Sequence, residues 1–188
     1  EAIIDQQKLD KPILCGLSMG GYIGLRALER FEEKFSAVVL CDTRADADGN
    51  EWKSKRAAAI KRINTEGLAP FVKDFITNCF GDDYKQTNPE ELEKIIAKSS
   101  SFNLVGVKGC LLAMLGRNDT TEFLNKIKIP ALVICGEFDS LTPSAVMKPM
   151  AEKINGAGFV VIKNSGHMSP IENPKEVNEA ITKFLARL

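Results

Sequence analysis

Three residue types that together make a catalytic serine site follow three apolar runs of this sequence. Ser18 lies in LCGLSMGG, with Gly16 and Gly20 two positions before and after it. Asp139 lies in CGEFDSLTP, and His167, the only histidine, lies in SGHMSPIENP. A serine hydroxyl becomes a strong nucleophile when a histidine removes its proton, and a carboxylate must fix the tautomer of that histidine. The three residues therefore predict a Ser-His-Asp triad, provided that the fold brings them together.

Each of the three residues also has an ordinary structural interpretation. A Gly-x-Ser-x-Gly stretch occurs in glycine-rich turns, a lone histidine is common at surfaces and in cores, and an aspartate often forms an Asx turn. Their common position favours chemistry, because each follows a predicted strand and their order is Ser, Asp, His. Sites in open α/β sheets assemble at the carboxyl ends of strands. We therefore interpret Ser18, Asp139 and His167 as catalytic.

The stretch around Ser18 has the form of a sharp strand-to-helix turn. Gly16 and Gly20 would let the strand and the helix approach each other without Cβ clashes, and the turn would lift the Ser18 hydroxyl out of the sheet. The backbone N–H of Met19, at the start of the helix, would then point to where an oxyanion forms. We expect Met19 to supply one oxyanion donor.

Four continuous apolar runs are predicted to be strands: Pro12–Leu17, Phe35–Cys41, Pro130–Cys135 and Gly158–Ile162. Each is rich in Val, Ile and Leu and does not alternate with polar residues. Such runs are typical of parallel strands that are buried on both faces.

Helical patterns follow these runs at Met19–Glu32, Thr142–Ile154 and Pro174–Leu188. The helix starts are marked by Asn173-Pro174, by Asn88-Pro89 and by Thr142-Pro143, which offer capping side chains before a proline. Alternation of strands with helices predicts an α/β fold with a mostly parallel, doubly wound sheet.

The stretch from about Arg44 to Lys126 breaks the alternation, because it contains helical patterns and turns but no convincing strand. It is too long for a simple connection between strands. We predict a helical insertion followed by a crossover helix at Phe102–Leu115. The domain organisation is then core at 1–43, a helical cap insertion with the crossover helix at 44–115, and core at 116–188.

Composition excludes several other classes of protein. Lys plus Arg and Asp plus Glu both number 25, so nothing favours nucleic acid or an anionic membrane as a partner. The cysteines are odd in number and scattered, without a metal-ligand or disulfide spacing; they are Cys15, Cys41, Cys79, Cys110 and Cys135. Those inside apolar runs are expected to act as small hydrophobic residues. A reducing cytoplasm is the expected setting.

The motifs GLSMGG, PALVICGEFDSLTP and FVVIKNSGHMSPIENP resemble those of the α/β-hydrolase superfamily, near the 3-oxoadipate enol-lactonases, carboxylesterases and meta-cleavage hydrolases. The stretch LLAMLGRNDTTEFLNKIKIP resembles the segment that joins their helical cap to the next core strand. The resemblance implies that Ser18 is the nucleophile, His167 the base, Asp139 its orienting acid and the Met19 N–H an oxyanion donor. It also implies a cofactor-free enzyme. The apolar composition of the cap implies a small, largely hydrophobic acyl substrate.

Two other carboxylates near the predicted site are given structural roles. Asp42 follows the second predicted strand, where some hydrolases place their acid, but its neighbours Thr43 and Arg44 favour a loop hydrogen bond or an ion pair. Glu137, two residues before Asp139, is likewise expected to be structural.

The resemblance also predicts that the chain is a portion of a hydrolase. Only about ten residues precede the elbow strand, which is the predicted strand Pro12–Leu17 that leads to Ser18. Family members carry several strands before it, together with the loop that supplies a second oxyanion N–H. One edge of the elbow strand would then be bare, and a homodimer through that edge is expected. Two alternatives to a serine hydrolase stay open: a non-catalytic ligand-binding or signalling module on this scaffold, and a fragment that is inactive without its N-terminal part.

Overall fold

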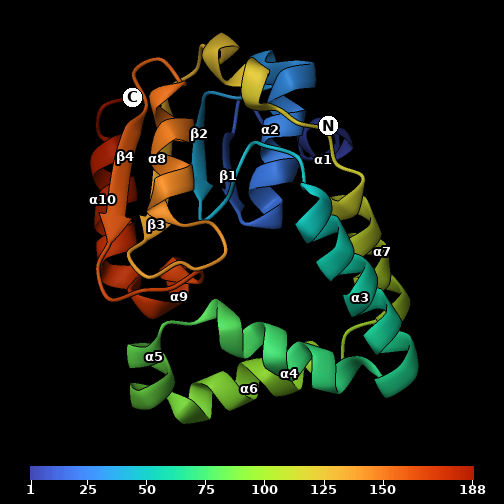
Figure 1. The fold of residues 1–188 in the computed structure, drawn as a ribbon. Coiled ribbons are helices and arrows are strands. Elements are labelled where there is room, and N and C mark those ends of the chain that lie inside the picture. Colours follow the sequence, from blue (N-terminus) through green and yellow to red (C-terminus); the bar gives the residue numbers. More distant parts are fainter.

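The computed structural model describes all residues, 1–188, as a parallel four-stranded sheet with helices on both faces and a further layer of helices beyond one end of the strands (Figure 1). The strands, in spatial order, are β1 (Ile13–Leu17), β2 (Ala37–Cys41), β3 (Ala131–Gly136) and β4 (Gly158–Ile162). The predicted α/β fold with a parallel sheet is confirmed.

The helices divide into those of the sheet layers and those of the long insertion. The first group is α1 (Ala2–Gln7), α2 (Met19–Phe31), α8 (Ser144–Glu152), α9 (Ser169–Glu172) and α10 (Pro174–Leu185). The second group is α3 (Asn50–Glu66), α4 (Leu68–Cys79), α5 (Asp82–Thr87), α6 (Pro89–Ser100) and α7 (Leu104–Leu115). Two short 3-10 turns complete the set, η1 (Glu32–Lys34) and η2 (Thr121–Lys126).

Both faces of the central strands are covered by apolar side chains of the helices. On one face, α2 and α8 pack Leu25 and Met147 against Leu40 and Val133. On the other face, α10 packs Val177 against a cluster that includes Val39, Leu132, Ile134 and Ile162. All residues of β2 and β3 are buried, as their continuous apolar sequences predict.

The outer strands differ from the prediction of burial on both faces. β1 exposes Ile13 and Cys15, and β4 exposes Gly158 and Val161. Each of these strands pairs with only one neighbour, so part of its surface stays open. The expectation that Cys15 acts as a buried small hydrophobic residue is therefore wrong, whereas Cys135 is fully buried in β3.

The predicted helix starts are confirmed in place but not always in their capping bonds. Asn173 precedes α10, and its side chain accepts a hydrogen bond from the Glu176 N–H at 3.3 Å. Asn88 precedes α6 without a capping bond from its side chain. Thr142 is not the cap of α8, because Pro143 takes that position and the Thr142 hydroxyl bonds to Asp139 instead.

Residues 44–115 contain the five helices α3–α7 and no strand, and α7 begins two residues after the predicted Phe102. Buried ionic contacts hold its entry and exit segments together at its base. Arg117 contacts the buried carboxylate of Asp48 and the backbone carbonyl of Asp46, and Arg56 contacts Asp48 as well. No helix of the protein combines the length and the apolar character that crossing a bilayer requires.

Candidate active site

Ser18 occupies a strained turn between β1 and α2. Its φ and ψ are 51° and −114°, a backbone conformation that residues other than glycine rarely adopt. The hydroxyl of Thr43, just after β2, donates to the Ser18 carbonyl oxygen at 2.7 Å and helps to hold this turn. A strained residue that its neighbours hold in place is characteristic of functional sites.

The glycines that the turn requires are only partly those expected. A Cβ on Gly16 would lie 2.5 Å from the Gly20 carbonyl oxygen, so strand and helix do cross at Gly16. A Cβ on Gly20 would meet no atom within 4 Å, whereas one on Gly21 would lie 2.4 Å from Thr43 Oγ1. The expectation that Gly20 prevents a clash by its missing Cβ is therefore wrong, and Gly21 has that role.

The fold brings the three predicted residues into one chain of hydrogen bonds. His167 Nε2 lies 2.8 Å from Ser18 Oγ, and His167 Nδ1 lies 2.9 Å from Asp139 Oδ2. Asp139 and His167 are 3% and 4% exposed, so water competes little with the contact between them. The geometry is that required for a serine activated by an oriented histidine.

Asp139 is held as a carboxylate that can only accept hydrogen bonds. Burial raises its pKa, but hydrogen bonds from His167 and Thr142 oppose burial, and the pKa lies below its ordinary value. The donors are His167 Nδ1, the N–H groups of Leu141 and Thr142, and the Thr142 hydroxyl at 2.5 Å. Because the carboxylate accepts, the Nδ1 of His167 carries the proton, and the Nε2 lone pair is free to accept from Ser18.

Met19 is the first residue of α2, directly after Ser18. Its N–H lies in the first turn, where no carbonyl of the helix can accept it. The N-terminus of the helix also carries partial positive charge. An oxygen that becomes negative beside Ser18 would therefore be stabilised by the Met19 N–H and by the positive end of the helix.

Asp42 lies beneath the site and joins the acid loop to the histidine loop. It is fully buried; its Oδ1 accepts the Gly136 N–H at 2.7 Å, and its Oδ2 accepts the Ser169 hydroxyl at 2.5 Å. Burial raises its pKa to about 7, although both hydrogen bonds oppose this. The loop hydrogen bond expected for Asp42 is present, whereas an ion pair with Arg44 is not, because Arg44 pairs with Asp46.

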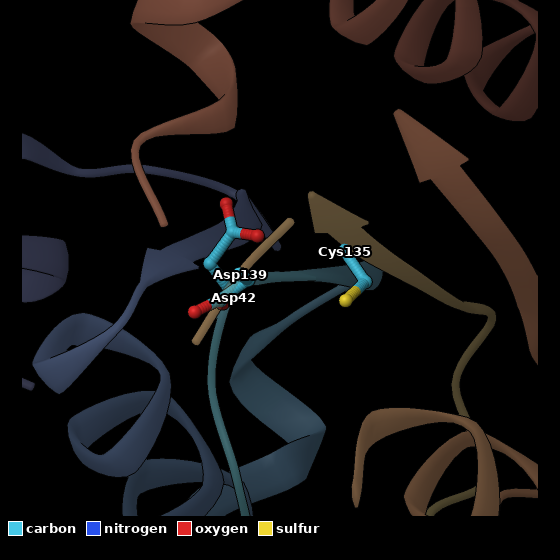
Figure 2. Close-up of side chains that lie close together, drawn as sticks. All are labelled: Asp42, Cys135 and Asp139. Atoms are coloured by element: carbon cyan, nitrogen blue, oxygen red, sulfur yellow. The ribbon is translucent and has the colours of Figure 1, made fainter. Parts of the chain in front are cut away.

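Asp42, Cys135 and Asp139 gather at the ends of β2 and β3, as Figure 2 shows. One potential ligand atom of each lies within 4.8 Å of the others, a spacing that a metal ion could bridge. Burial raises the pKa of the Cys135 thiol to about 12, and a protonated thiol is a poor metal ligand. Asp42 already accepts hydrogen bonds from Gly136 and Ser169, and Asp139 already accepts them from the N–H and the hydroxyl of Thr142. These three residues are therefore better suited to support the loop that carries Asp139 than to bind a metal ion.

A cavity of about 680 Å³ opens over Ser18, Met19 and His167. Most of its lining residues are hydrophobic, and the insertion helices contribute many of them. Those from the insertion include Phe71, Phe75, Phe102, Val107, Leu111 and Met114. Three charged residues, Arg44, Asp48 and Arg56, also line the cavity, and the prediction of an apolar cap did not include them.

The residues that hydrogen-bond to the loops carrying Ser18, Asp139 and His167 were not predicted from the sequence. These are Thr43, Thr142, Ser169 and Glu172, which bond to the backbone or side chains of the three loops. Their positions just after β2 or within a few residues of Asp139 and His167 were the available signal. Glu137 was expected to be structural, and it accepts the Asn164 N–H at 3.0 Å.

Comparison with known proteins places this site in a family. A sequence profile of the alpha/beta hydrolase fold matches residues 1–174. The chain is 28% identical to 3-oxoadipate enol-lactonase 2 of Acinetobacter baylyi over 187 residues, which cover 99% of this chain and 68% of that protein.

Two solved structures superpose closely on the chain. A thermophilic esterase from Thermogutta terrifontis matches with a TM-score of 0.93 and 33% identity, over 98% of this chain and 68% of the esterase. The enol-lactonase from Burkholderia xenovorans LB400 matches with a TM-score of 0.87 and 29% identity, over 98% of this chain and 69% of that one. The chain therefore belongs to the α/β-hydrolase fold family and is a hydrolytic enzyme of that family.

Proposed function

We propose that this protein hydrolyses an ester, a lactone or a related carbonyl compound through an acyl-enzyme on Ser18. The observation that carries the proposal is the chain of hydrogen bonds from Ser18 Oγ to His167 Nε2 and from His167 Nδ1 to Asp139, at 2.8 and 2.9 Å. Ser18, Met19 and His167 line the same cavity, where a substrate carbonyl could reach them. The names of the enol-lactonase and esterase relatives support a carbonyl substrate of this kind.

The first half of the reaction forms the acyl-enzyme. Ser18 Oγ attacks the substrate carbonyl carbon while its proton passes to His167 Nε2, and Asp139 stabilises the imidazolium that results. The carbonyl oxygen becomes an oxyanion and receives a hydrogen bond from the Met19 N–H. The intermediate then collapses: the bond to the leaving oxygen breaks, and the Nε2 proton passes to that oxygen.

The second half reverses these roles with water. His167 Nε2 takes a proton from a water molecule, whose oxygen attacks the acyl carbon. Collapse of the second intermediate breaks the bond to Ser18 Oγ, which regains its proton from Nε2. The products are a carboxylic acid and an alcohol, or a single hydroxy or oxo acid from a lactone.

We also propose that α3–α7 act as a cap that selects the substrate. Phe71 and Phe75 of α4, together with Phe102 between α6 and α7, line the cavity, and their rings favour a small acyl group with an apolar surface. The contacts of Arg117 and Arg56 with Asp48 hold the base of this cap.

The proposal is tested by labelling with a fluorophosphonate, which reacts covalently with an activated serine. The protein is expected to be labelled at Ser18, and Ser18→Ala is expected to lose both the label and the hydrolysis of a short-chain aryl ester. Ser54→Ala is the matched control, because Ser54 is exposed on α3 and far from the triad in sequence. Labelling that persists in Ser18→Ala would overturn the proposal. Tight ligand binding without acylation would favour a binding module instead.

A further inference from the structure

Glu172 ends α9, five residues after His167, and has no place in the reaction proposed above. Its two carboxylate oxygens accept three backbone hydrogen bonds. Oε1 accepts from the N–H groups of Gly166 and Met168, at 2.9 and 3.1 Å, and these residues flank His167 on both sides. Oε2 accepts from the Gly81 N–H at 2.7 Å, at the junction of α4 and α5.

The N–H of His167, between those of Gly166 and Met168, is also bonded to the junction of α4 and α5. The His167 N–H donates to the Cys79 carbonyl oxygen at 2.8 Å. Three consecutive N–H groups of the histidine loop therefore have fixed acceptors, two in Glu172 and one in the insertion. Since Glu172 also bonds to Gly81, these contacts form a closed ring that joins the insertion to the backbone of His167.

Close packing leaves this ring little room to move. A Cβ on Gly166 would lie 2.6 Å from the Gly81 nitrogen, and a Cβ on Gly136 would lie 1.9 Å from the Gly166 carbonyl oxygen. The histidine loop therefore lies directly between the end of β3 and the residues after α4. A small displacement of the loop would lengthen both contacts of the imidazole, to Ser18 and to Asp139.

We propose that Glu172 is a positioning residue that sets the imidazole of His167 and couples its position to that of the helical insertion. The inference rests on the proposed function of His167, but it concerns the backbone of the loop rather than the chemical step. A charged acceptor of three N–H groups is suited to this task, because hydrogen bonds to a carboxylate are shorter and stronger than those to a neutral group. Reactions of this kind are sensitive to a misplacement of about 1 Å, which can lower the rate about 100-fold.

The test uses Glu172→Gln, which keeps the size of the side chain but replaces one acceptor oxygen by an NH₂ group facing a backbone N–H. We expect kcat for an aryl ester to fall about 10- to 100-fold, while KM changes by less than about threefold. The matched control is Glu176→Gln, since Glu176 also accepts a backbone N–H, that of Lys163, but lies outside the ring. Its kcat is expected to stay within about twofold of the parent protein.

A spectroscopic readout separates positioning from a general loss of structure. His167 is the only histidine, so the proton on its Nδ1 gives a single NMR resonance, shifted downfield by the contact with Asp139. In Glu172→Gln this resonance is expected to broaden or disappear at a temperature where circular dichroism shows a folded chain. This readout requires no hydrolysis, so it tests the inference even if the proposed reaction is wrong.

A second variant keeps the inference testable if Glu172→Gln does not fold. Glu172→Asp keeps the charge but shortens the side chain by one methylene group, so that its carboxylate no longer spans the distance between the Gly81 N–H and the N–H groups of Gly166 and Met168. This variant is expected to weaken the Nδ1 resonance in the same direction, with a smaller fall in kcat. An unchanged resonance in both variants, or a kcat of Glu172→Gln within about twofold of the parent, would overturn the inference.

Discussion

At the scale of single residues, two buried aspartates that lie close together behave in opposite ways. Burial raises the pKa of both, but Asp139 accepts four hydrogen bonds from protein donors while Asp42 accepts two. The net result is a pKa below the ordinary value for Asp139 and one of about 7 for Asp42. Hydrogen bonding therefore separates the pKa values of two carboxylates that burial shifts in the same direction, and His167 contacts Asp139, the one whose pKa is lowered.

The raised pKa of Asp42 predicts a pH-dependent stability. The folded state keeps the proton on Asp42 up to about pH 7, whereas the unfolded chain releases it near pH 4. The folded state therefore binds more protons between these values, and the free energy of unfolding falls as pH rises through this window, by about 1 kcal/mol per pH unit. Asp139, whose pKa is lowered, acts oppositely and loses its contribution only as pH falls below its unfolded value of about 4.

Asp42→Asn isolates this effect, because asparagine tolerates the positive φ of 44° at this position. Its amide oxygen can also still accept the Gly136 N–H. We expect the difference in the free energy of unfolding, variant minus parent, to rise by about 2 kcal/mol from pH 5 to pH 8. Urea unfolding of both proteins measures this difference. Curves of unfolding free energy against pH that run parallel for the two proteins would contradict this expectation.

At the scale of elements, the turn at Ser18 depends on how closely α2 crosses β1 and the end of β2. Gly16 and Gly21 are the positions at which a side chain would collide with the facing backbone or with Thr43. The contact of Thr43 with the Ser18 carbonyl oxygen, at 2.7 Å, then holds the strained backbone. The position of the Ser18 hydroxyl is therefore set by the packing of three elements and not by the pentapeptide alone.

Two alanine substitutions distinguish these glycines. Gly21→Ala is expected to lower the free energy of unfolding by about 1–3 kcal/mol, because its methyl group would displace Thr43. Gly20→Ala is expected to leave it unchanged or to raise it by up to about 1 kcal/mol, since alanine favours the helix and its Cβ would meet no atom within 4 Å. Urea unfolding measures both. Equal losses for the two variants would show that the crossing is not as close as described.

At the scale of the whole molecule, the sheet has an uncovered edge. β1 pairs with β2 on one side only, and its outer side carries apolar residues: Ile13 is 39% exposed and the preceding Leu9 is 46% exposed. An open apolar strand edge is a template for pairing with another chain. We therefore keep the proposal that two copies associate through β1.

This proposal predicts a concentration-dependent dimer in solution, visible by size-exclusion chromatography with light scattering. Ile13→Lys places a charge on the edge strand and is expected to shift the protein to monomer. Ile23→Lys is the matched control, because Ile23 is 62% exposed but lies on α2 rather than on the edge. A monomer whose β1 amides are nevertheless well protected from hydrogen exchange would contradict the proposal.

Much of the fold could be predicted because strands and helices differ in local patterns. Pro12 and Pro130 precede β1 and β3, and the runs that follow them are continuous and apolar, as expected of a parallel sheet. The burial of the outer strands could not be predicted in the same way. Cys15 and Cys135 stand in equally apolar runs, and only the position of the strand in the sheet makes one exposed and the other buried.

The sequence by itself determined which residues stand at the carboxyl ends of the strands, because strand ends follow from local apolar runs and turn residues. That was enough to predict Ser18, Asp139 and His167 as one site. Only the tertiary structure decided what surrounds them: the buried Asp42, the contact of Gly21 with Thr43, and the bonds of Glu172 to three backbone N–H groups. These contacts join residues of different elements, so their partners depend on how the elements pack and leave no mark in any one stretch of the chain.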